Sequence, residues 1–556
     1  MTFFFAFYYI FCYNTLVKIF KGASTLLERA EYPEQVGVDS AVVTDLIRFY
    51  EKLDFNIDSL MVVRHGKVAC ECHWAPNRVD TPHDMFSLSK SVTATAIGIA
   101  VDEGYVSLDT KIYEKYFPHK LEGLTGQQKE WAQKVTVHDV LSMRMGKVTS
   151  VFDDKAKTDW VDGILDKPIQ FEPNTDWKYI SENAYLLSWI IQRETGMTMT
   201  EYLTPRLYEP LGIKVPHWEQ SHVGVDAGGW GLKLTVEDIA KISMLYLNKG
   251  VYDGKRIFSE DWFNKATYPY TKKTYPVFSD NAEYGYQVWI DHEHNDTTYR
   301  FTGLYGQFSF IFPDYDACVV ITASDTRDGD TIASAYKHFP KAFIEPCEIS
   351  DEKRFEFKAL TTTRGYGPDF KKSTGKRNPK AEKKISNRMI KLVPLPYSST
   401  QGAVTYFMWR KKIGGLTDIK FSFDKDSAYM SFKENNSERM TIRAGMNNEY
   451  VHNVITLGEN ELIVDAQATW NRDGSLEFFL YNSGRPQSKR LRFIFKGNAV
   501  ILKQSSFPGF GAVAKFNIEF NMGMNVGPKL EGFLEKGGAV FGTFYSDTDT
   551  VGRFVE

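Results

Sequence analysis

Three early segments of the chain differ in the spacing of their hydrophobic positions. Residues 39–53 place apolar side chains at intervals of three and four, which predicts a helix with one buried face. Residues 59–73 predict two strands that flank the turn Arg64-His65-Gly66-Lys67. Residues 90–103 are small or apolar almost all round, so this segment predicts a helix buried on every side.

The pattern continues as a mixture of helices and strands up to about residue 350. Further helices are expected at Ala184–Thr195, Val236–Asn248 and Asp330–Phe343. Strands are expected at Tyr286–Ile290, Tyr299–Thr302, Gln307–Phe312 and Ala317–Thr322. Because helices cluster in the middle and strands come from both ends, residues 25–350 are predicted to form an α+β domain, an antiparallel sheet with helices packed on it.

A basic segment separates this region from one of a different character. Residues 351–388 include eight Lys and Arg residues between positions 371 and 388, which favours a solvated linker over a binding patch. From 389 to 556 the chain alternates with a period of two, which predicts an all-β domain, a barrel or a sandwich. Its expected strands are Ile419–Phe423, Ala428–Phe432, Arg439–Ala444, Glu461–Ala466, Leu476–Tyr481, Leu491–Phe495 and Phe516–Phe520.

Composition narrows the function classes only modestly. The chain has 556 residues, of which 43% are hydrophobic, so it has ample material for a large core. The net charge of −3 gives no electrostatic reason to expect a nucleic-acid partner. Five cysteines imply no disulfide framework. The tract Cys70-Glu71-Cys72-His73 and the pair His292 and His294 lack the paired spacing of metal sites, so no metal is predicted.

The first 24 residues form an apolar extension. Its run Phe3–Tyr13 is short for a membrane span and lacks the basic start of a signal peptide. A poor signal, a membrane-associated tail and a misplaced start codon all stay open. The sequence therefore leaves localisation and membrane association undetermined, with the cytoplasm and the cell envelope or exterior as alternatives.

The first candidate for chemistry is Ser87-Leu88-Ser89-Lys90, an S-x-x-K motif. On a helix, Ser87 and Lys90 share a face, and a desolvated lysine amine loses its proton readily enough to activate a hydroxyl. The same spacing occurs at Ser334, Ser350, Ser373 and Ser422. Only Ser87 lies between a predicted hairpin and a long buried helix, so it is the expected nucleophile.

Several segments in this order resemble the class C β-lactamase-like serine hydrolases, which include penicillin-binding enzymes, family VIII esterases, D-aminopeptidases and 6-aminohexanoate-dimer hydrolases. The similar segments are residues 85–109, 135–146, 171–213, 228–262 and 284–289. The resemblance implies a β-lactamase/transpeptidase-like fold in which Ser87 is acylated and Lys90 moves its proton. It also implies that Tyr179, in Tyr179-Ile180-Ser181, is the general base and acid. Ser181 stands where the family often has asparagine.

The third family motif is altered in this chain. The strand that resembles the K-T-G motif of β-lactamases has Phe301-Thr302-Gly303, followed by Leu304. The resemblance implies that the backbone N–H groups of Leu304 and Ser87 form an oxyanion hole. Phe301 cannot hold a substrate carboxylate as lysine would, so we expect poor β-lactamase activity.

Two hypotheses follow from these motifs. The favoured one is a serine hydrolase that acts on a small-molecule or peptidic amide or ester and needs no cofactor. The alternative is a catalytically inactive relative that binds peptide or cell-wall-like ligands, because Phe301 and Ser181 depart from the family pattern. The presence of Ser87, Lys90 and Tyr179 together favours the enzyme. The sequence does not indicate an oligomeric state.

Overall fold

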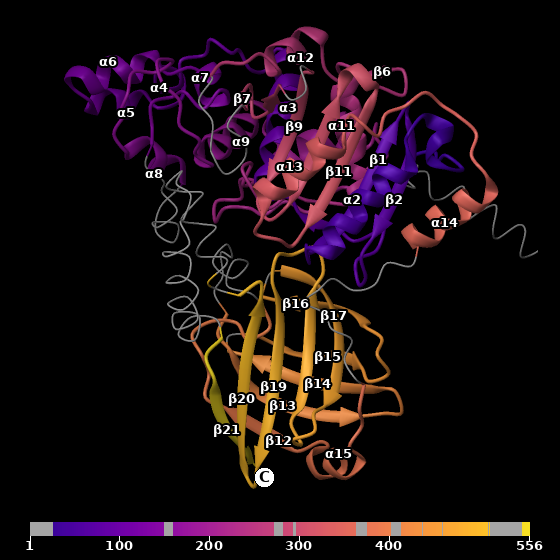
Figure 1. The fold of residues 1–556 in the computed structure, drawn as a ribbon. Helices are drawn as coiled ribbons and strands as arrows, with labels where there is room; N and C mark the ends of the chain where they lie inside the picture. Colours follow the sequence, from indigo (N-terminus) through magenta and orange to yellow (C-terminus); the bar gives the residue numbers. More distant parts are fainter. Residues whose placement is uncertain are drawn as a thin grey trace, which may run out of the picture.

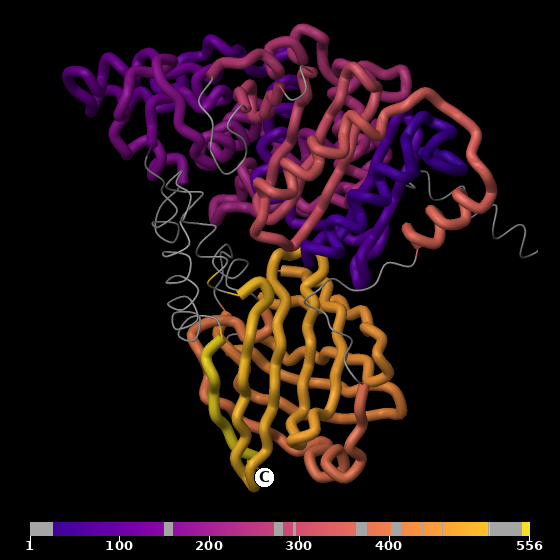
Figure 2. Tube along the Cα trace, in the orientation of Figure 1, coloured from indigo at the N-terminus to yellow at the C-terminus, as the bar shows by residue number. Residues whose placement is uncertain are grey.

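The computed structural model describes residues 26–148, 160–271, 282–292, 296–362, 375–401, 413–435, 437–458, 460–509, 511 and 547–555. These residues form two domains from consecutive parts of the chain, a sheet domain and a barrel domain (Figures 1 and 2). The apolar extension and the expected strand Phe516–Phe520 lie outside the described residues. Within the described part of the chain, every helix is too short or too polar to cross a bilayer.

The sheet domain is built on seven antiparallel strands in the order β2-β1-β11-β10-β9-β8-β7. Their bounds are β1 Ile57–Arg64, β2 Lys67–His73, β7 Glu283–Tyr284, β8 Trp289–Asp291, β9 Thr298–Gly303, β10 Gln307–Phe312 and β11 Ala317–Ala323. Strand β1 pairs with β11, so strands from the two ends of the domain lie side by side inside the sheet. The predicted α+β class and the expected hairpin are confirmed.

Helices cover both faces of this sheet. Alternate residues of β1 point to opposite faces, so Met61 joins the core beneath α3 and α11, whereas Leu60 joins the core beneath α2 and α13. The helices are α2 Ser40–Lys52, α3 Ser89–Asp102, α4 Ile112–Tyr116, α5 Pro118–Gly123, α6 Gly126–Lys134, α7 Val137–Leu141, α8 Trp160–Asp166, α9 Glu182–Thr195, α10 Met199–Leu203, α11 Val236–Leu247, α12 Glu260–Ala266, α13 Asp328–His338 and α14 Asp351–Thr362. Short strand pairs join β3 His83–Asp84 with β4 Lys233–Leu234, and β5 Val251–Tyr252 with β6 Lys255–Arg256.

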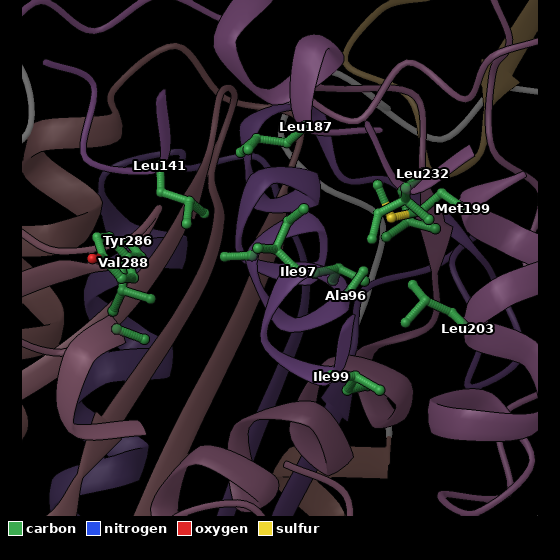
Figure 3. Packing of buried hydrophobic residues seen from close by; sticks show 14 of the residues in the cluster. Ala96, Ile97, Ile99, Leu141, Leu187, Met199, Leu203, Leu232, Tyr286 and Val288 are labelled. Atoms are coloured by element: carbon green, nitrogen blue, oxygen red, sulfur yellow. The ribbon is translucent and has the colours of Figure 1, made fainter. Parts of the chain in front are cut away.

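Helix α3 is buried from Ser89 to Ala100, as its sequence predicts. Figure 3 shows Ala96, Ile97 and Ile99 of this helix among side chains from several other elements. Gly98 lies against Trp262 so closely that a Cβ atom would come within 2.3 Å of the indole ring. The helix is therefore held on all sides, which fixes the position of the turn at its start.

The C-terminal domain is a closed barrel, a choice that the alternation pattern left open. Its sheet runs β15-β14-β13-β12-β21-β20-β19-β18-β17-β16, and an additional pairing of β15 with β17 closes it. The strands are β12 Met389–Leu392, β13 Leu416–Phe423, β14 Ser427–Glu434, β15 Arg439–Gly445, β16 Val451–Leu457, β17 Asn460–Trp470, β18 Leu476–Asn482, β19 Ser488–Lys496, β20 Ala499–Phe507 and β21 Thr550–Val555. Closure lets side chains from every strand share one core.

Three local expectations need correction. Within the predicted linker 351–388, residues 363–374 lie outside the described residues, and the described helices are not solvated chain: α14 packs on β2 and α2, and α15 (Pro379–Ile385) packs on the barrel. Phe357 and Ile385 are the buried anchors of these two helices. Helix α13 ends at His338, short of the expected Phe343, because Pro340 lacks a backbone donor and disfavours helix before it. The expected strand Tyr286–Ile290 begins only at Trp289.

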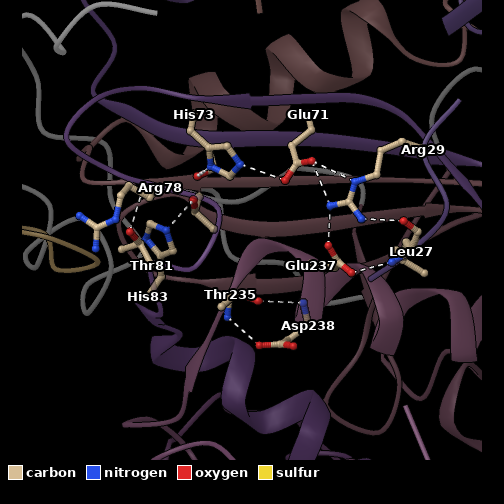
Figure 4. A network of polar contacts seen from close by, with 12 residues as sticks. Leu27, Arg29, Glu71, His73, Arg78, Thr81, His83, Thr235, Glu237 and Asp238 are labelled. Atoms are coloured by element: carbon tan, nitrogen blue, oxygen red, sulfur yellow. Dashed lines mark hydrogen bonds and ion pairs between the residues drawn. The ribbon is translucent and has the colours of Figure 1, made fainter. Parts of the chain in front are cut away.

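The Cys-Glu-Cys-His tract lies on β2, where the carboxylate of Glu71 binds Arg29 and His73. Arg29 donates to Glu71 at 3.0 Å and to Glu237 of α11 at 2.6 Å, and His73 lies 3.1 Å from Glu71 (Figure 4). Cys70 and Cys72 are both buried. The tract therefore joins β2 to α11 through Arg29.

Candidate active site

Ser87 lies in a tight turn between the short strand β3 and helix α3. The turn spans Phe86–Leu88, and Phe86 has a φ of 45°, a left-handed conformation that is costly for a bulky residue. Its ring contacts that of Tyr305 with 5.2 Å between centroids. The N–H of Met85 donates to the carbonyl of Leu232 at 2.8 Å. Tertiary contacts on both sides of the serine therefore hold it at the start of a fixed helix.

Lys90 lies one helical turn beyond the serine and points back to it. Lys90 Nζ donates to Ser87 Oγ at 2.7 Å and to the carbonyl oxygen of Gly229 at 2.9 Å. The side chain is 1% exposed, and burial lowers the pKa of Lys90 from 10.5 to about 7. A substantial fraction of Lys90 is therefore neutral near pH 7, when its lone pair can accept the serine proton.

Tyr179 lies beside this lysine, three residues before the start of helix α9 at Glu182. Lys90 Nζ is 4.9 Å from the centroid of the Tyr179 ring, in a cation–π arrangement when the amine is protonated. Tyr284 and Trp289 enclose the ring, each with its centroid 5.9 Å from that of Tyr179. The fold therefore brings Ser87, Lys90 and Tyr179 from two distant parts of the sequence into one cluster.

Two neighbours of this cluster were not predicted from the sequence. The charge of Glu182, the first residue of α9, acts against burial and raises the pKa of Lys90. Gly229 approaches Ser181 so closely that a Cβ on the glycine would lie 2.7 Å from the Ser181 carbonyl oxygen. The backbone of Ser181, which was expected to make a polar contact in the site, thus packs against Gly229, and the carbonyl oxygen of Gly229 accepts a hydrogen bond from Lys90. Because a single glutamate in a helix has no distinctive signature, only the fold identifies Glu182.

The end of strand β9 lies against the serine turn, where its Gly303 contacts the backbone of Met85 and Leu88. A Cβ on Gly303 would lie 2.1 Å from the carbonyl oxygen of Met85 and 3.2 Å from the backbone nitrogen of Leu88. Only glycine therefore lets β9 approach the serine turn this closely. Leu304, the expected oxyanion donor, directly follows Gly303 and is half-buried.

Thr302 on the same strand is held by a buried ion pair. Its hydroxyl oxygen accepts a hydrogen bond from Arg300 Nη1 at 2.8 Å. Arg300 is fully buried and pairs with Asp291 at 2.8 Å, and the hydroxyl of Tyr336 donates to the same carboxylate at 2.7 Å. This chain of contacts, which sequence reasoning missed, fixes the orientation of Thr302.

Phe301 occupies the position where the resemblance implied a lysine in β-lactamases. Its side chain is fully buried against Tyr246 of α11, with 4.9 Å between ring centroids. The Phe301 ring is part of the hydrophobic core beneath the sheet and cannot form an ion pair with a substrate carboxylate.

A pH dependence follows from the position of Glu182. If neutral Lys90 is the active form, kcat/KM falls as the pH drops below about 7. Glu182→Gln removes a charge that favours the protonated amine, so we expect the acidic limb to move to lower pH by roughly 0.5–1 pH unit. Rate measurements between pH 5 and 9 test this, with the exposed Glu260→Gln as control. An unchanged limb, or one moved to higher pH, would contradict the assignment.

Comparison with known proteins gives one family. A family model described as Beta-lactamase matches residues 49–338, slightly more than half of the 556-residue chain. The 6-aminohexanoate-dimer hydrolase of Paenarthrobacter ureafaciens is 24% identical over 300 residues, which cover 49% of this chain and 74% of that protein. Protein flp of Staphylococcus aureus (strain MW2) is 24% identical over 200 residues, 33% of this chain and 39% of its own length. The solved octameric penicillin-binding protein homologue from Pyrococcus abyssi is 16% identical, with a TM-score of 0.44 and coverage of 83% of this chain and 97% of its own.

Proposed function

The chain belongs to the Beta-lactamase family, and we propose that it is a serine hydrolase that cleaves an amide or ester bond through an acyl-enzyme on Ser87. The observation that carries this proposal is the 2.7 Å contact between Ser87 Oγ and the buried, readily deprotonated amine of Lys90. A nucleophile within hydrogen-bond reach of its base is the geometry that acyl transfer requires. The name of the 6-aminohexanoate-dimer hydrolase supports hydrolysis as the proposed reaction.

The first half of the proposed reaction forms the acyl-enzyme. Ser87 Oγ attacks the substrate carbonyl carbon while its proton passes to Lys90, which contacts the hydroxyl and so takes, in this scheme, the base role that the resemblance gave to Tyr179. The backbone N–H groups of Ser87 and Leu304 stabilise the negative oxygen of the tetrahedral intermediate. Tyr179, beside Lys90, passes the proton to the departing amine or alcohol, and the carbon–heteroatom bond breaks.

The second half returns the enzyme to its starting state. A water molecule gives up a proton to Lys90 and Tyr179 and attacks the acyl carbon. The bond from that carbon to Ser87 Oγ then breaks, and the serine recovers its proton. The proposed scheme uses protein side chains, two backbone N–H groups and a water molecule, and needs no cofactor.

Phe301 sets the proposed limit on the substrate. Penicillins and cephalosporins carry a carboxylate that a cation would have to neutralise, and Phe301 supplies none. We therefore propose an amide or ester substrate without an essential carboxylate at that place, and poor hydrolysis of β-lactams. The inactive binding protein is the alternative that the following experiment separates from the enzyme.

The proposed nucleophile is tested by mapping a fluorophosphonate adduct. We expect one adduct per chain, located by fragmentation on Ser87 within the tryptic peptide 79–90, because the amine of Lys90 contacts this hydroxyl at 2.7 Å. Ser350 has the same spacing to a lysine, at Lys353, but is exposed and provides an internal control. A folded protein without an adduct, or with one on another serine, would favour the binding protein.

A further inference from the structure

The barrel contacts the sheet domain through the turn between β18 and β19. Figure 1 shows the barrel beneath the sheet domain, with the two packed end to side. Within this turn, the carbonyl oxygen of Gly484 accepts a hydrogen bond from the N–H of Asp84 on β3, at 2.8 Å. Arg485 Nε lies 3.6 Å from the Asp84 carboxylate. The turn thus adds to the edge of the short strand that leads to the nucleophile.

The fit at Gly484 leaves no room for a side chain. Gly484 has a φ of 73°, and a Cβ there would lie 2.1 Å from the carbonyl oxygen of Pro82 and 3.0 Å from the Cα of His83. Backbone packs directly on backbone at this point. A contact of this kind fixes the position of both segments, because no flexible side chain absorbs a displacement.

A second, fully buried set of contacts locks the turn in place. The hydroxyl of Tyr481 at the end of β18 donates to Asp58 Oδ1 at 2.7 Å, and the amide of Asn77 donates to the same oxygen at 2.9 Å. Ser324 Oγ lies 2.9 Å from Asp58 Oδ2 and 3.0 Å from the carbonyl oxygen of Arg485. Asp58 and Tyr481 are 1% and 3% exposed. The interface therefore resembles a domain core more than a transient contact between modules.

The contacted segment is the one whose geometry the proposed reaction needs. Asp84 is three residues before Ser87, and Phe86 between them has the costly left-handed conformation. Such a conformation persists only where surrounding structure holds it. Asp84 pairs with Lys233 of β4 on one side and with the barrel turn on the other.

We infer that the barrel is a positioning domain for the active site, in which Tyr481 and the Gly484 turn hold residues 82–87 so that Ser87 stays in reach of Lys90. The inference rests on the proposed function for its catalytic consequence, and on the contacts alone for its structural one. Tyr481 and Gly484 are positioning residues, because they act on the nucleophile through the segment before it.

The test compares two glycines of the barrel in the full-length chain. Gly484→Ala adds a methyl group against Pro82 and His83, whereas Gly474→Ala adds one at a similar φ of 80° with nothing within 4 Å. Both variants therefore carry the same backbone strain, and only the first disturbs the interface. We expect Gly484→Ala to speed hydrogen exchange in residues 82–88 and to slow fluorophosphonate acylation by roughly 10–100-fold, since small misplacements of a nucleophile are costly. Gly474→Ala is expected to match the wild type in both.

Tyr481→Phe is the second variant, because it keeps the ring and removes only the hydroxyl that binds Asp58. It should change exchange and acylation in the same direction, to a smaller extent. If Gly484→Ala does not fold, Tyr481→Phe decides the matter. Wild-type exchange in residues 82–88 of the folded variants would overturn the inference. If the wild type itself forms no adduct, the proposed function fails, and the exchange measurement still tests the interface separately.

Discussion

Replacing Ser87 with alanine is expected to lower hydrolysis of a reactive ester by about 10⁴-fold or more, because the substitution removes the atom that becomes acylated. Ser87 Oγ is the hydroxyl oxygen that accepts a hydrogen bond from Lys90 Nζ, at 2.7 Å. The loss should appear in kcat, and binding of the substrate should change little. Initial rates with p-nitrophenyl esters of several chain lengths provide the measurement.

The matched control for this variant is Ser350→Ala. Ser350 has a lysine three residues later but lies on an exposed segment before α14. Its replacement should leave the rate within about twofold, and both variants should unfold within about 1 kcal/mol of the wild type. A Ser87→Ala protein that retains most of its turnover would show that another group performs the chemistry.

The second large effect is expected for Lys90→Met, which removes the base and keeps an unbranched side chain only one atom shorter. Loss of a positioned general base costs 10²–10⁴-fold, so we expect kcat/KM to fall in this range and its acidic limb near pH 7 to disappear. The same pH series that tests Glu182→Gln gives this measurement. A Lys90→Met enzyme with an unchanged limb would assign the titration to another group.

The same substitution should make the protein more stable. Burial lowers the pKa of Lys90 from 10.5 to about 7, so the unfolded chain binds this proton more strongly than the folded one. This group therefore opposes folding fully below about pH 7, and its penalty declines as the pH rises toward 10.5. Methionine removes the penalty, and we expect a gain on the order of 2 kcal/mol at pH 7, measured by chemical denaturation. Lys358→Met, at an exposed lysine of α14, controls for the general loss of a charge.

The contrast between activity and stability distinguishes a catalytic lysine from a structural one. If Lys90 only supported the fold, its replacement by methionine would destabilise the protein. Higher stability combined with lost turnover is the pattern of a group held in an unfavourable state for chemistry. If Lys90→Met lost stability as well as turnover, Lys90 would be a structural residue that holds the serine turn.

Elements whose signals are local could be predicted from the amino-acid sequence. The apolar pattern of residues 90–103 was enough to predict a helix buried on every side, because burial all round leaves no polar face. The order of S-x-x-K, tyrosine and glycine motifs predicted the family, and the family model confirmed it. Alternation in the last third predicted an all-β domain.

Features that depend on contacts between distant residues could be recognised only in the folded protein. Alternation has the same period in a barrel and a sandwich, so only the pairing of β15 with β17 reveals the closed barrel. Glu182 raises the pKa of Lys90, and Arg300 donates a hydrogen bond to Thr302. Both effects depend on burial and proximity, which no local sequence pattern encodes. The contact of Gly484 with Pro82 joins residues about 400 positions apart. A sequence specifies the period of its own hydrophobic positions directly, whereas such long-range contacts arise only when whole elements pack.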